Sequence, residues 1–320
     1  MSYKVLQPGL LSSIQDLGRF GQHDIGLTTG GPLDNEAFLW ANRILHNVPN
    51  ASAIELSFGG LQLLAQTSSY LCVTGAQLDL TINGVEKALW TSHKILPDDE
   101  IKLGYSSHGC RSYVSVAGGF NINPSFGSSA TVAREKVGGI AGTKLAANDY
   151  LPCSRITQLP RQALAPEHRP LYAQKNTSRR DGNTVLRLLP GYQHHLFDAA
   201  TRARFFHGQY TVTDRSDRMG MRLEGPAVPC PSQNMLSEGI CLGAVQVPAD
   251  GQPIVLLKDR QTIGGYPKIG AVLARDTASL AQLRPGDTLH FEEVDLYQAH
   301  TINTLAQLKF NHTPLLHLKD

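Results

Sequence analysis

The strongest constraint on the fold is a tight turn between two short runs of alternating residues. Residues 78–82 alternate between apolar and polar side chains, Asn83-Gly84 follows, and residues 85–89 form the next run. Asn and Gly both accept a positive φ, so this pair favours a type I′ turn between antiparallel strands. Residues 113–117 alternate in the same way, and residues 253–257 resemble a buried strand. The sequence therefore predicts a mainly β protein with short strands and few helices.

Composition agrees with a folded, turn-rich protein. Gly 30 and Pro 18 make 48 of 320 residues, or 15%, against about 12% in average proteins. Apolar residues are 41% and charged residues 18%, which excludes a disordered chain. The charge of +2 argues against nucleic acid as the main partner. Apolar runs are only a few residues long, and the N-terminus lacks a signal-peptide core, so a cytoplasmic protein without a membrane partner is expected.

The chain length and sequence patterns that recur along the chain predict two related β-rich halves. We call these recurring patterns echoes. An apolar residue, a turn closed by Asp and a strand recur at residues 96–101, 145–151 and 283–289. A second echo links residues 16–19 with residues 217–220. Prolines and a weakly apolar stretch place a linker or long excursion at 154–183, between an N-terminal half over 1–153 and a C-terminal half over 184–320.

Two helices are expected. Asp34 is a good N-cap for a helix with apolar residues at helical spacing up to Leu45. A second helix is expected near residues 196–206.

Common catalytic and metal-binding motifs are absent. Residues 138–144 lack the spacing of a phosphate loop, and residues 104–109 miss that of a nucleophile elbow by one position. The adjacent pair His194-His195 would point to opposite faces of a strand, so no metal site is assigned. The five cysteines contain no C-x-x-C pair and are expected to be buried, reduced thiols.

The most unusual segment runs from Ser237 to Gly270. A buried strand is followed by Lys258-Asp259-Arg260-Gln261-Thr262 and then by Gly264-Gly265. Arg260 offers a rigid fork of donors for a carboxylate or phosphate, Lys268 is a second cation, and paired glycines let backbone approach a ligand closely. The alternative is a polar turn with an Asp–Arg ion pair and no ligand.

Two further segments are candidates. Residues 213–225 hold six charged residues in thirteen, and the alternative there is a solvated loop. Residues 13–34 contain Asp16, Arg19 and Asp34, of which Asp34 is also explained as the helix cap.

Together these segments resemble the family variously called the C subunit of 5-oxoprolinase, the second subunit of allophanate hydrolase or biotin-dependent carboxyltransferase. The resemblance covers about residues 3–295 and rests on the stretch 237–270 and on residues 15–19, 31–34, 188–191 and 217–220. It implies two cyclophilin-like β-barrel halves. The chain departs from the family pattern at Pro32, at Gly142-Thr143-Lys144 and at Ile263, which bears on substrate selectivity.

The resemblance further implies a C subunit that acts with the A and B subunits of 5-oxoprolinase to open 5-oxo-L-proline to L-glutamate with hydrolysis of ATP. The ATP, with Mg²⁺, would bind at an interface shared between subunits, and no biotin would be attached to this chain. The residues expected to carry catalysis are Asp259, Arg260, Gln261, Thr262, Asp217 and Arg218. Those expected to bind substrate or ATP are Gly264, Gly265, Tyr266, Lys268, Gln246, Asp16, Arg19 and Asp34.

Two other functions fit the same resemblance. The chain could be a carboxyltransferase component that uses carboxybiotin carried on another chain, as in urea or allophanate metabolism. It could also be a regulatory protein that binds a partner and antagonises a kinase inhibitor.

Overall fold

The computed structural model describes residues 1–173, 184–230 and 235–319, which form two compact units. Of the described residues, unit 1 contains 1–22, 29–173 and 314–319, and unit 2 contains 23–28, 184–230 and 235–313. Both units are built mainly from short strands, so the predicted fold class is confirmed. No helix among the described residues is long and apolar enough to cross a membrane.

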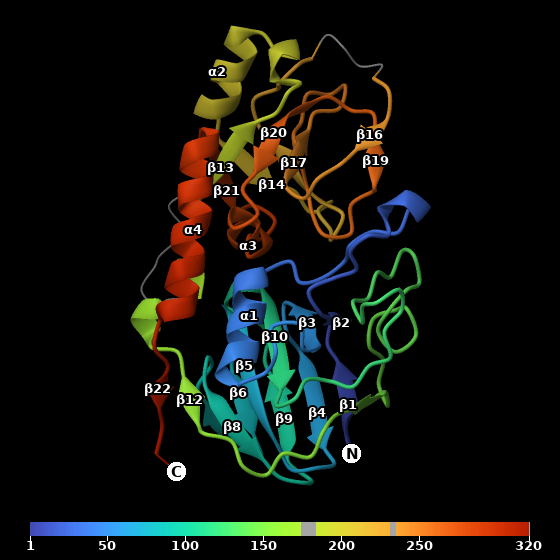
Figure 1. Ribbon diagram of the computed structural model, residues 1–320, viewed down its shortest axis with the longest axis vertical. Helices are drawn as coiled ribbons and strands as arrows, with labels where there is room; N and C mark the ends of the chain where they lie inside the picture. Colours follow the sequence, from blue (N-terminus) through green and yellow to red (C-terminus); the bar gives the residue numbers. More distant parts are fainter. Residues whose placement is uncertain (174–183, 231–234, 320) are drawn as a thin grey trace. The chain divides into compact units, whose positions relative to one another are not determined.

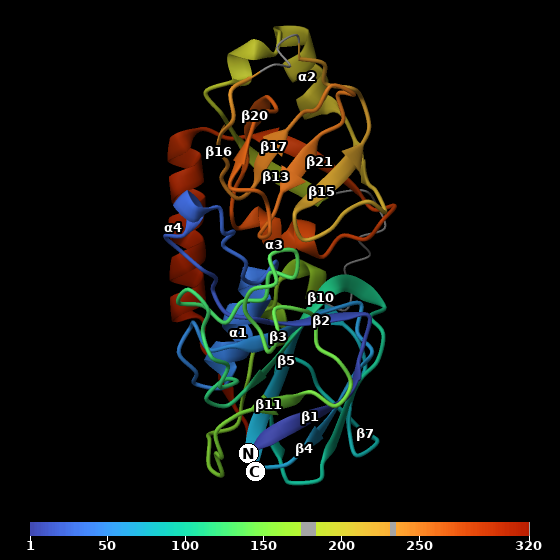
Figure 2. The same ribbon diagram turned by 90° about the vertical axis from the view of Figure 1, so that its right-hand side faces the viewer.

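Unit 1 contains two large sheets that share a core. In the six-stranded sheet the order is β11-β1-β4-β9-β6-β7, and Figure 2 shows β11, β1 and β4 side by side. The five-stranded sheet has the order β2-β3-β10-β5-β8. The bounds are β1 Ser2–Pro8, β2 Leu11–Gln15, β3 Ala53–Ser57, β4 Leu61–Ala65, β5 Ser69–Gln77, β6 Leu80–Ile82, β7 Val85–Lys87, β8 Ser92–Ile95, β9 Glu100–Leu103, β10 His108–Val116 and β11 Tyr150–Pro152.

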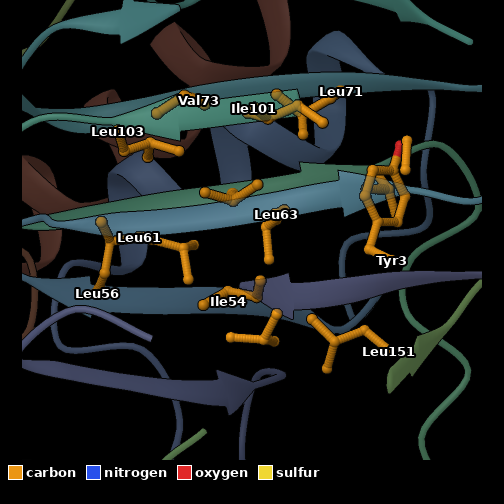
Figure 3. Close-up of a cluster of buried hydrophobic side chains, with 14 of the residues drawn as sticks. Tyr3, Ile54, Leu56, Leu61, Leu63, Leu71, Val73, Ile101, Leu103 and Leu151 are labelled. Atoms are coloured by element: carbon orange, nitrogen blue, oxygen red, sulfur yellow. The ribbon is translucent and has the colours of Figure 1, made fainter. Parts of the chain in front are cut away.

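The core of unit 1 lies where the two sheets face each other (Figure 3). Leu63 and Ile101 come from the six-stranded sheet, and Ile54 and Val73 come from the five-stranded sheet. All four side chains are fully buried. Each fully buried aliphatic side chain of this kind contributes about 1.5–3 kcal/mol. The shared core therefore holds the two sheets together.

Unit 2 contains a closed barrel of seven strands in the order β13-β20-β17-β18-β15-β14-β21 (Figure 1). Their bounds are β13 Thr184–Pro190, β14 Tyr210–Val212, β15 Gly220–Glu224, β17 Ala244–Gln246, β18 Ile254–Leu256, β20 Lys268–Val272 and β21 Thr288–Glu293. A separate two-stranded ribbon pairs β16 (Glu238–Gly239) with β19 (Ile263–Gly264). Strand β19 of this ribbon follows β18 along the chain, and the ribbon belongs to the candidate site.

The predicted hairpin and buried strand are confirmed. Asn83 and Gly84 have φ values of 52° and 76° and join β6 to β7, with Ile82 opposite Val85. The expected strand at 113–117 lies within β10 but for its last residue, and the one at 253–257 contains β18.

The three turns that end in Asp each contain the same type of hydrogen bond. The carboxylates of Asp99, Asp149 and Asp287 accept the backbone amide three residues earlier, at distances of 2.7, 2.7 and 2.8 Å. Strands β9, β11 and β21 follow directly after these turns. The carboxylate satisfies an amide that the turn leaves without a backbone acceptor.

Local sequence signals are sufficient to predict some of the helices and not others. Helix α1 (Asn35–Ile44) begins after Asp34, whose carboxylate accepts the amide of Ala37, as predicted. Helix α2 (Ala199–His207) lies close to its expected range. Helices α3 (Asp276–Ala281) and α4 (Leu296–His312) were not predicted. Only Ala299 of α4 is buried, so the helix lacks the apolar stripe that would reveal it, although its capping box was a readable signal.

The expected linker at 154–183 is only partly described. Residues 154–173 belong to unit 1, and within them β12 (Gln162–Ala163) pairs with β22 (Leu316–His317). Residues 174–183 lie outside the described residues. Four of the five cysteines are buried, but Cys241 is exposed, so the expectation of buried thiols is wrong at that position.

Gly75 and Gly84 give a matched test of the packing in unit 1. Both have positive φ, at 98° and 76°, but a Cβ at Gly75 would collide with the backbone of Arg111 and Ser112, whereas none of the described atoms lies within 4 Å of one at Gly84. We expect Gly84→Ala to cost about 1 kcal/mol from backbone strain alone. Gly75→Ala should cost about 3 kcal/mol or more, because strain and overlap add. Both tryptophans, Trp40 and Trp90, lie in unit 1, so urea unfolding followed by tryptophan fluorescence measures the difference. Equal losses would show that the contact with β10 is not tight.

Candidate functional site

A buried ion pair joins two loops at the candidate site in unit 2. The Arg218 Nε and Nη2 groups donate to the two carboxylate oxygens of Asp259 at 2.8 and 2.9 Å. The side chains are only 12% and 9% exposed, and the Asp259 amide also donates to the Arg218 carbonyl at 2.9 Å. Parallel bonds of this kind fix orientation as well as distance. The two sequence segments that contain these residues are therefore brought together as expected.

Arg260 is a buried cation held by backbone carbonyls. Its Nε donates to the Ile240 carbonyl at 3.1 Å and its Nη1 to the Leu257 carbonyl at 3.2 Å. The residue is 7% exposed, and no carboxylate of the described residues forms an ion pair with it. Burial lowers the pKa of this guanidinium, which nevertheless stays charged at neutral pH. Its remaining N–H groups are available to an anionic ligand.

Glu238 on β16 connects the ribbon to the barrel. Its carboxylate forms an ion pair with Lys268 at the start of β20 and accepts hydrogen bonds from the Tyr192 hydroxyl and the Gln193 amide. The Gln193 side-chain oxygen accepts the Lys268 amide at 2.8 Å. The Glu238 carboxylate thus binds three groups at once, and one of them is the Lys268 ammonium, which it holds at the ribbon.

Gln246 carries a buried donor with no partner among the described residues. The residue is 6% exposed, and its Nε2 forms no hydrogen bond. A Cβ at Gly264 would lie 2.9 Å from this nitrogen, so glycine leaves the amide uncovered. An unpaired buried amide costs about 1–3 kcal/mol, which a bound acceptor would recover. A Cβ at Gly265 would lie 2.9 Å from the Met235 carbonyl, so this glycine allows close packing of backbone.

The other residues predicted in this loop are more exposed. Gln261 and Tyr266 are exposed, and the Thr262 carbonyl accepts the Ile240 amide at 3.0 Å. Asp217 is exposed, and its carboxylate accepts the amides of Met219 and Gly220. Asp217 therefore shapes the turn that delivers Arg218.

The residues predicted from the N-terminal segment lie in unit 1 and are buried in hydrogen-bond networks there. The carboxylate of Asp16 accepts from Ser128 and from the amide and hydroxyl of Ser129. Arg19 is fully buried and donates to the carbonyls of Ser125, Ser128 and Ala130. Both residues hold the loop at 125–130 in place.

Asp34 likewise has partners within unit 1. It caps α1, and its second carboxylate oxygen accepts the buried hydroxyl of Tyr172. These contacts account for the residue as the helix cap. The binding role expected for it, like those of Asp16 and Arg19, stays a prediction.

Sequence reasoning missed Tyr192, Gln193 and the role of Glu238. Glu238 lies within the unusual segment, but its partners are about 30 and 45 residues away along the chain. The run at 188–191, which immediately precedes Tyr192, was the only signal near the missed pair. Among the described residues, no group of three or more His, Cys, Asp or Glu could hold a metal ion.

Comparison with known protein families assigns this chain to one of them. Residues 25–293 match the family model described as the carboxyltransferase domain, subdomain A and B. The chain belongs to this family. The C subunit of 5-oxoprolinase from Escherichia coli strain K12 is 33% identical over 299 residues, which cover 92% of each chain. The C subunit of 5-oxoprolinase from Haemophilus influenzae is 35% identical over 289 residues, 90% of each chain.

A solved structure with a similar fold agrees with this family assignment. The crystal structure of the K. lactis urea amidolyase matches all of this chain with a TM-score of 0.90 and 26% identity, but the match covers only 20% of that protein. Relatives of this chain are thus parts of enzymes, and the shared region is one module of a longer enzyme in K. lactis.

Removal of Arg218 should loosen both loops of the site. We expect Arg218→Ala to speed amide hydrogen exchange in residues 213–220 and 257–262 about a hundredfold, which corresponds to about 3 kcal/mol, because Asp259 loses the guanidinium that balances its buried charge. Arg134→Ala, which breaks an exposed pair with Glu135, should change exchange around residue 134 by about twofold or less. Unchanged exchange in the Arg218 variant would show that the ion pair does not hold the loops.

Proposed function

We propose that this chain is the C subunit of an ATP-dependent 5-oxoprolinase, which opens 5-oxo-L-proline to L-glutamate together with the A and B subunits of that enzyme. The observation that carries the proposal is that unit 2 contains the buried, unpartnered amide of Gln246, opposite Lys268 in the barrel, and the buried guanidinium of Arg260, which forms no ion pair with a described carboxylate. The match to relatives named as the C subunit of 5-oxoprolinase, over nine-tenths of both chains, supports it. The proposed partners are the A and B subunits, and the proposed location is the cytoplasm.

The chemistry explains why such donors are needed. The amide of an unstrained lactam is a poor electrophile. Transfer of the terminal phosphoryl group of ATP to the lactam oxygen makes that oxygen a good leaving group. Water then adds to the carbon, and the ring nitrogen leaves as the amine, which breaks the C–N bond and gives an open-chain acyl phosphate. A second water hydrolyses this acyl phosphate to L-glutamate and phosphate. The negative charge that develops on oxygen needs positioned donors in a site where water is scarce.

The side chains of unit 2 suit these tasks. Arg260 and Lys268 would hold the phosphoryl group or the substrate carboxylate, and the Gln246 amide would donate to a carbonyl oxygen. The Arg218–Asp259 pair would position Arg260 through the adjacent backbone. Gln261, Thr262 and Tyr266 would orient the ligand or meet another subunit, since two of these side chains are exposed.

The residues fit the phosphates of ATP better than they fit a metal. Two cations and a free amide suit phosphate oxygens. Mg²⁺ would be held mainly by those phosphates and by water, as is usual for this ion, because the described residues offer no cluster of acidic ligands. The nucleotide would bind where subunits meet.

Reconstitution tests the proposed function directly. We expect glutamate and ADP to form from 5-oxo-L-proline and ATP when this chain is mixed with the A and B subunits, because each of the three chains supplies part of the site. Omission of any one of the three should abolish turnover. Full turnover in the absence of this chain would overturn the proposal.

Paired arginine variants test Arg260. We expect Arg260→Lys to lower kcat/KM by at least about a hundredfold, because a lysine cannot keep both carbonyl bonds and also reach the ligand. Arg222→Lys is the matched control, since Arg222 is exposed on β15 of the same barrel and should give the wild-type rate. Circular dichroism checks that both variants fold. Equal rates in the two variants would remove Arg260 from the site.

A second candidate is a carboxyltransferase component that takes the carboxyl group from carboxybiotin on another chain. The close structural match to part of the K. lactis urea amidolyase favours it. Activity that requires a biotinylated protein and is lost with avidin would select this alternative. A stable complex with the B subunit of 5-oxoprolinase that alters a kinase without oxoprolinase turnover would instead indicate the regulatory function.

A further inference from the structure

A second candidate binding site lies in unit 1. A cavity of about 950 Å³ lies beside β7 and β8, which are the edge strands of the two sheets. Residues 157–161 line it as well. Pockets for small molecules usually have volumes of about 300–1,000 Å³. The cavity beside these two strands is thus large enough for a small organic molecule.

Positive charge exceeds negative charge in the lining of this cavity. Lys87, Lys94 and Arg161 line the cavity, and none of them forms an ion pair with a described residue. Asp99 is the acidic residue of the lining, and its two oxygens already accept the Asn83 side-chain amide and the Leu96 amide, both at 2.7 Å. The lining therefore carries three cations against one carboxylate, an excess of positive charge that an anion could balance.

One buried donor beside the cavity has no partner among the described residues. Tyr70 also lines the cavity and is 5% exposed. The Nε of Arg161 is buried and makes no hydrogen bond in the described part of the chain, although its Nη1 donates to the Lys319 carbonyl at 3.3 Å. Groups of this kind gain free energy when a ligand supplies acceptors.

The pKa of His93 responds to the positive charges around the cavity. It lines the cavity and is 7% exposed, and its Nε2 lies 2.7 Å from the Ala88 carbonyl. Burial lowers the pKa of His93, and the positive charges of Lys87 and Arg161 lower it further. The hydrogen bond to the Ala88 carbonyl opposes this shift, and His93 lines the same cavity as Lys87 and Arg161.

We propose that this cavity, the β7–β8 pocket, binds a small molecule that carries a phosphoryl group on an apolar body. A phosphate ester is a dianion with three acceptor oxygens, which suits several converging cations. A monocarboxylate would leave more of that charge unbalanced. The remaining walls include Ile82, Leu159 and Pro160, which suit the apolar body of the ligand.

Simple probes test the ligand class. Phenyl phosphate, benzoate and phenol are titrated into the full chain by calorimetry at low salt and pH 7.5. We expect saturable binding of phenyl phosphate, benzoate at least about tenfold weaker, and phenol weaker still, because two charges meet the cations. Benzoate that binds as tightly as phenyl phosphate would overturn the phosphoryl assignment, and absence of saturable phenyl phosphate binding would overturn the pocket.

Charge-removal variants locate the site. We expect Lys94→Gln and Arg161→Gln each to weaken phenyl phosphate binding about tenfold, and Tyr70→Phe to weaken it a few fold. Lys102→Gln is the matched control, because Lys102 is exposed on β9 and does not line the pocket. An equal loss in the control would show non-specific attraction and overturn the site.

Two further readouts separate this pocket from the proposed oxoprolinase site. Arg260→Lys should bind phenyl phosphate like the wild type, and binding lost in that variant but kept in Lys94→Gln would place the ligand in unit 2 and overturn the inference. In NMR titrations phenyl phosphate should raise the pKa of His93, because the bound anion offsets Lys87 and Arg161. A His93 pKa that does not move would contradict the proposal.

Discussion

The candidate site depends on the paired hydrogen bonds between Arg218 and Asp259. A buried ion pair gains little net stability, because both charges lose water, but it is very sensitive to geometry. Asp259 directly precedes Arg260, so the ion pair also fixes the backbone position from which the Arg260 side chain extends. Arg260 in turn bonds to the carbonyl of Ile240, just after β16 of the ribbon. One ion pair thus orders two loops and, through its neighbour, the ribbon.

The same turn chemistry recurs in both units. Asp99 and Asp149 of unit 1 and Asp287 of unit 2 each accept an amide three residues earlier and precede a strand. Asp16 and Asp217 each accept the amide two residues later. A short carboxylate is the simplest substitute for a backbone acceptor in a tight turn. The same turn chemistry thus serves both units, and the relation between the two halves stays a prediction.

The fold was predictable where a few adjacent residues decide it. The Asn83-Gly84 turn and the Asp34 cap of α1 depend on backbone angles and hydrogen bonds within one or two turns of chain, and both were recovered. Helix α4 was missed because its 17 residues bury only Ala299, so apolar spacing gives no signal. The pairing of β12 with β22 could not be foreseen either, because it joins residues more than 150 positions apart. Long-range pairing depends on the whole sheet and leaves no local pattern.

The sequence by itself determined the strand-rich class, the tight turns and the polar stretch after β18, because these follow from local composition and spacing. Only the tertiary structure decided what each charge does. Arg19 and Arg260 are both buried arginines bound to backbone carbonyls. Arg19 donates to the carbonyls of the loop at 125–130, whereas Arg260 donates to the carbonyls of Ile240 and Leu257, which come from different parts of the unusual segment. Glu238 meets Lys268 only because the ribbon and the barrel bring them together. A side chain's type is written in the sequence, but its partners are set by packing between distant segments.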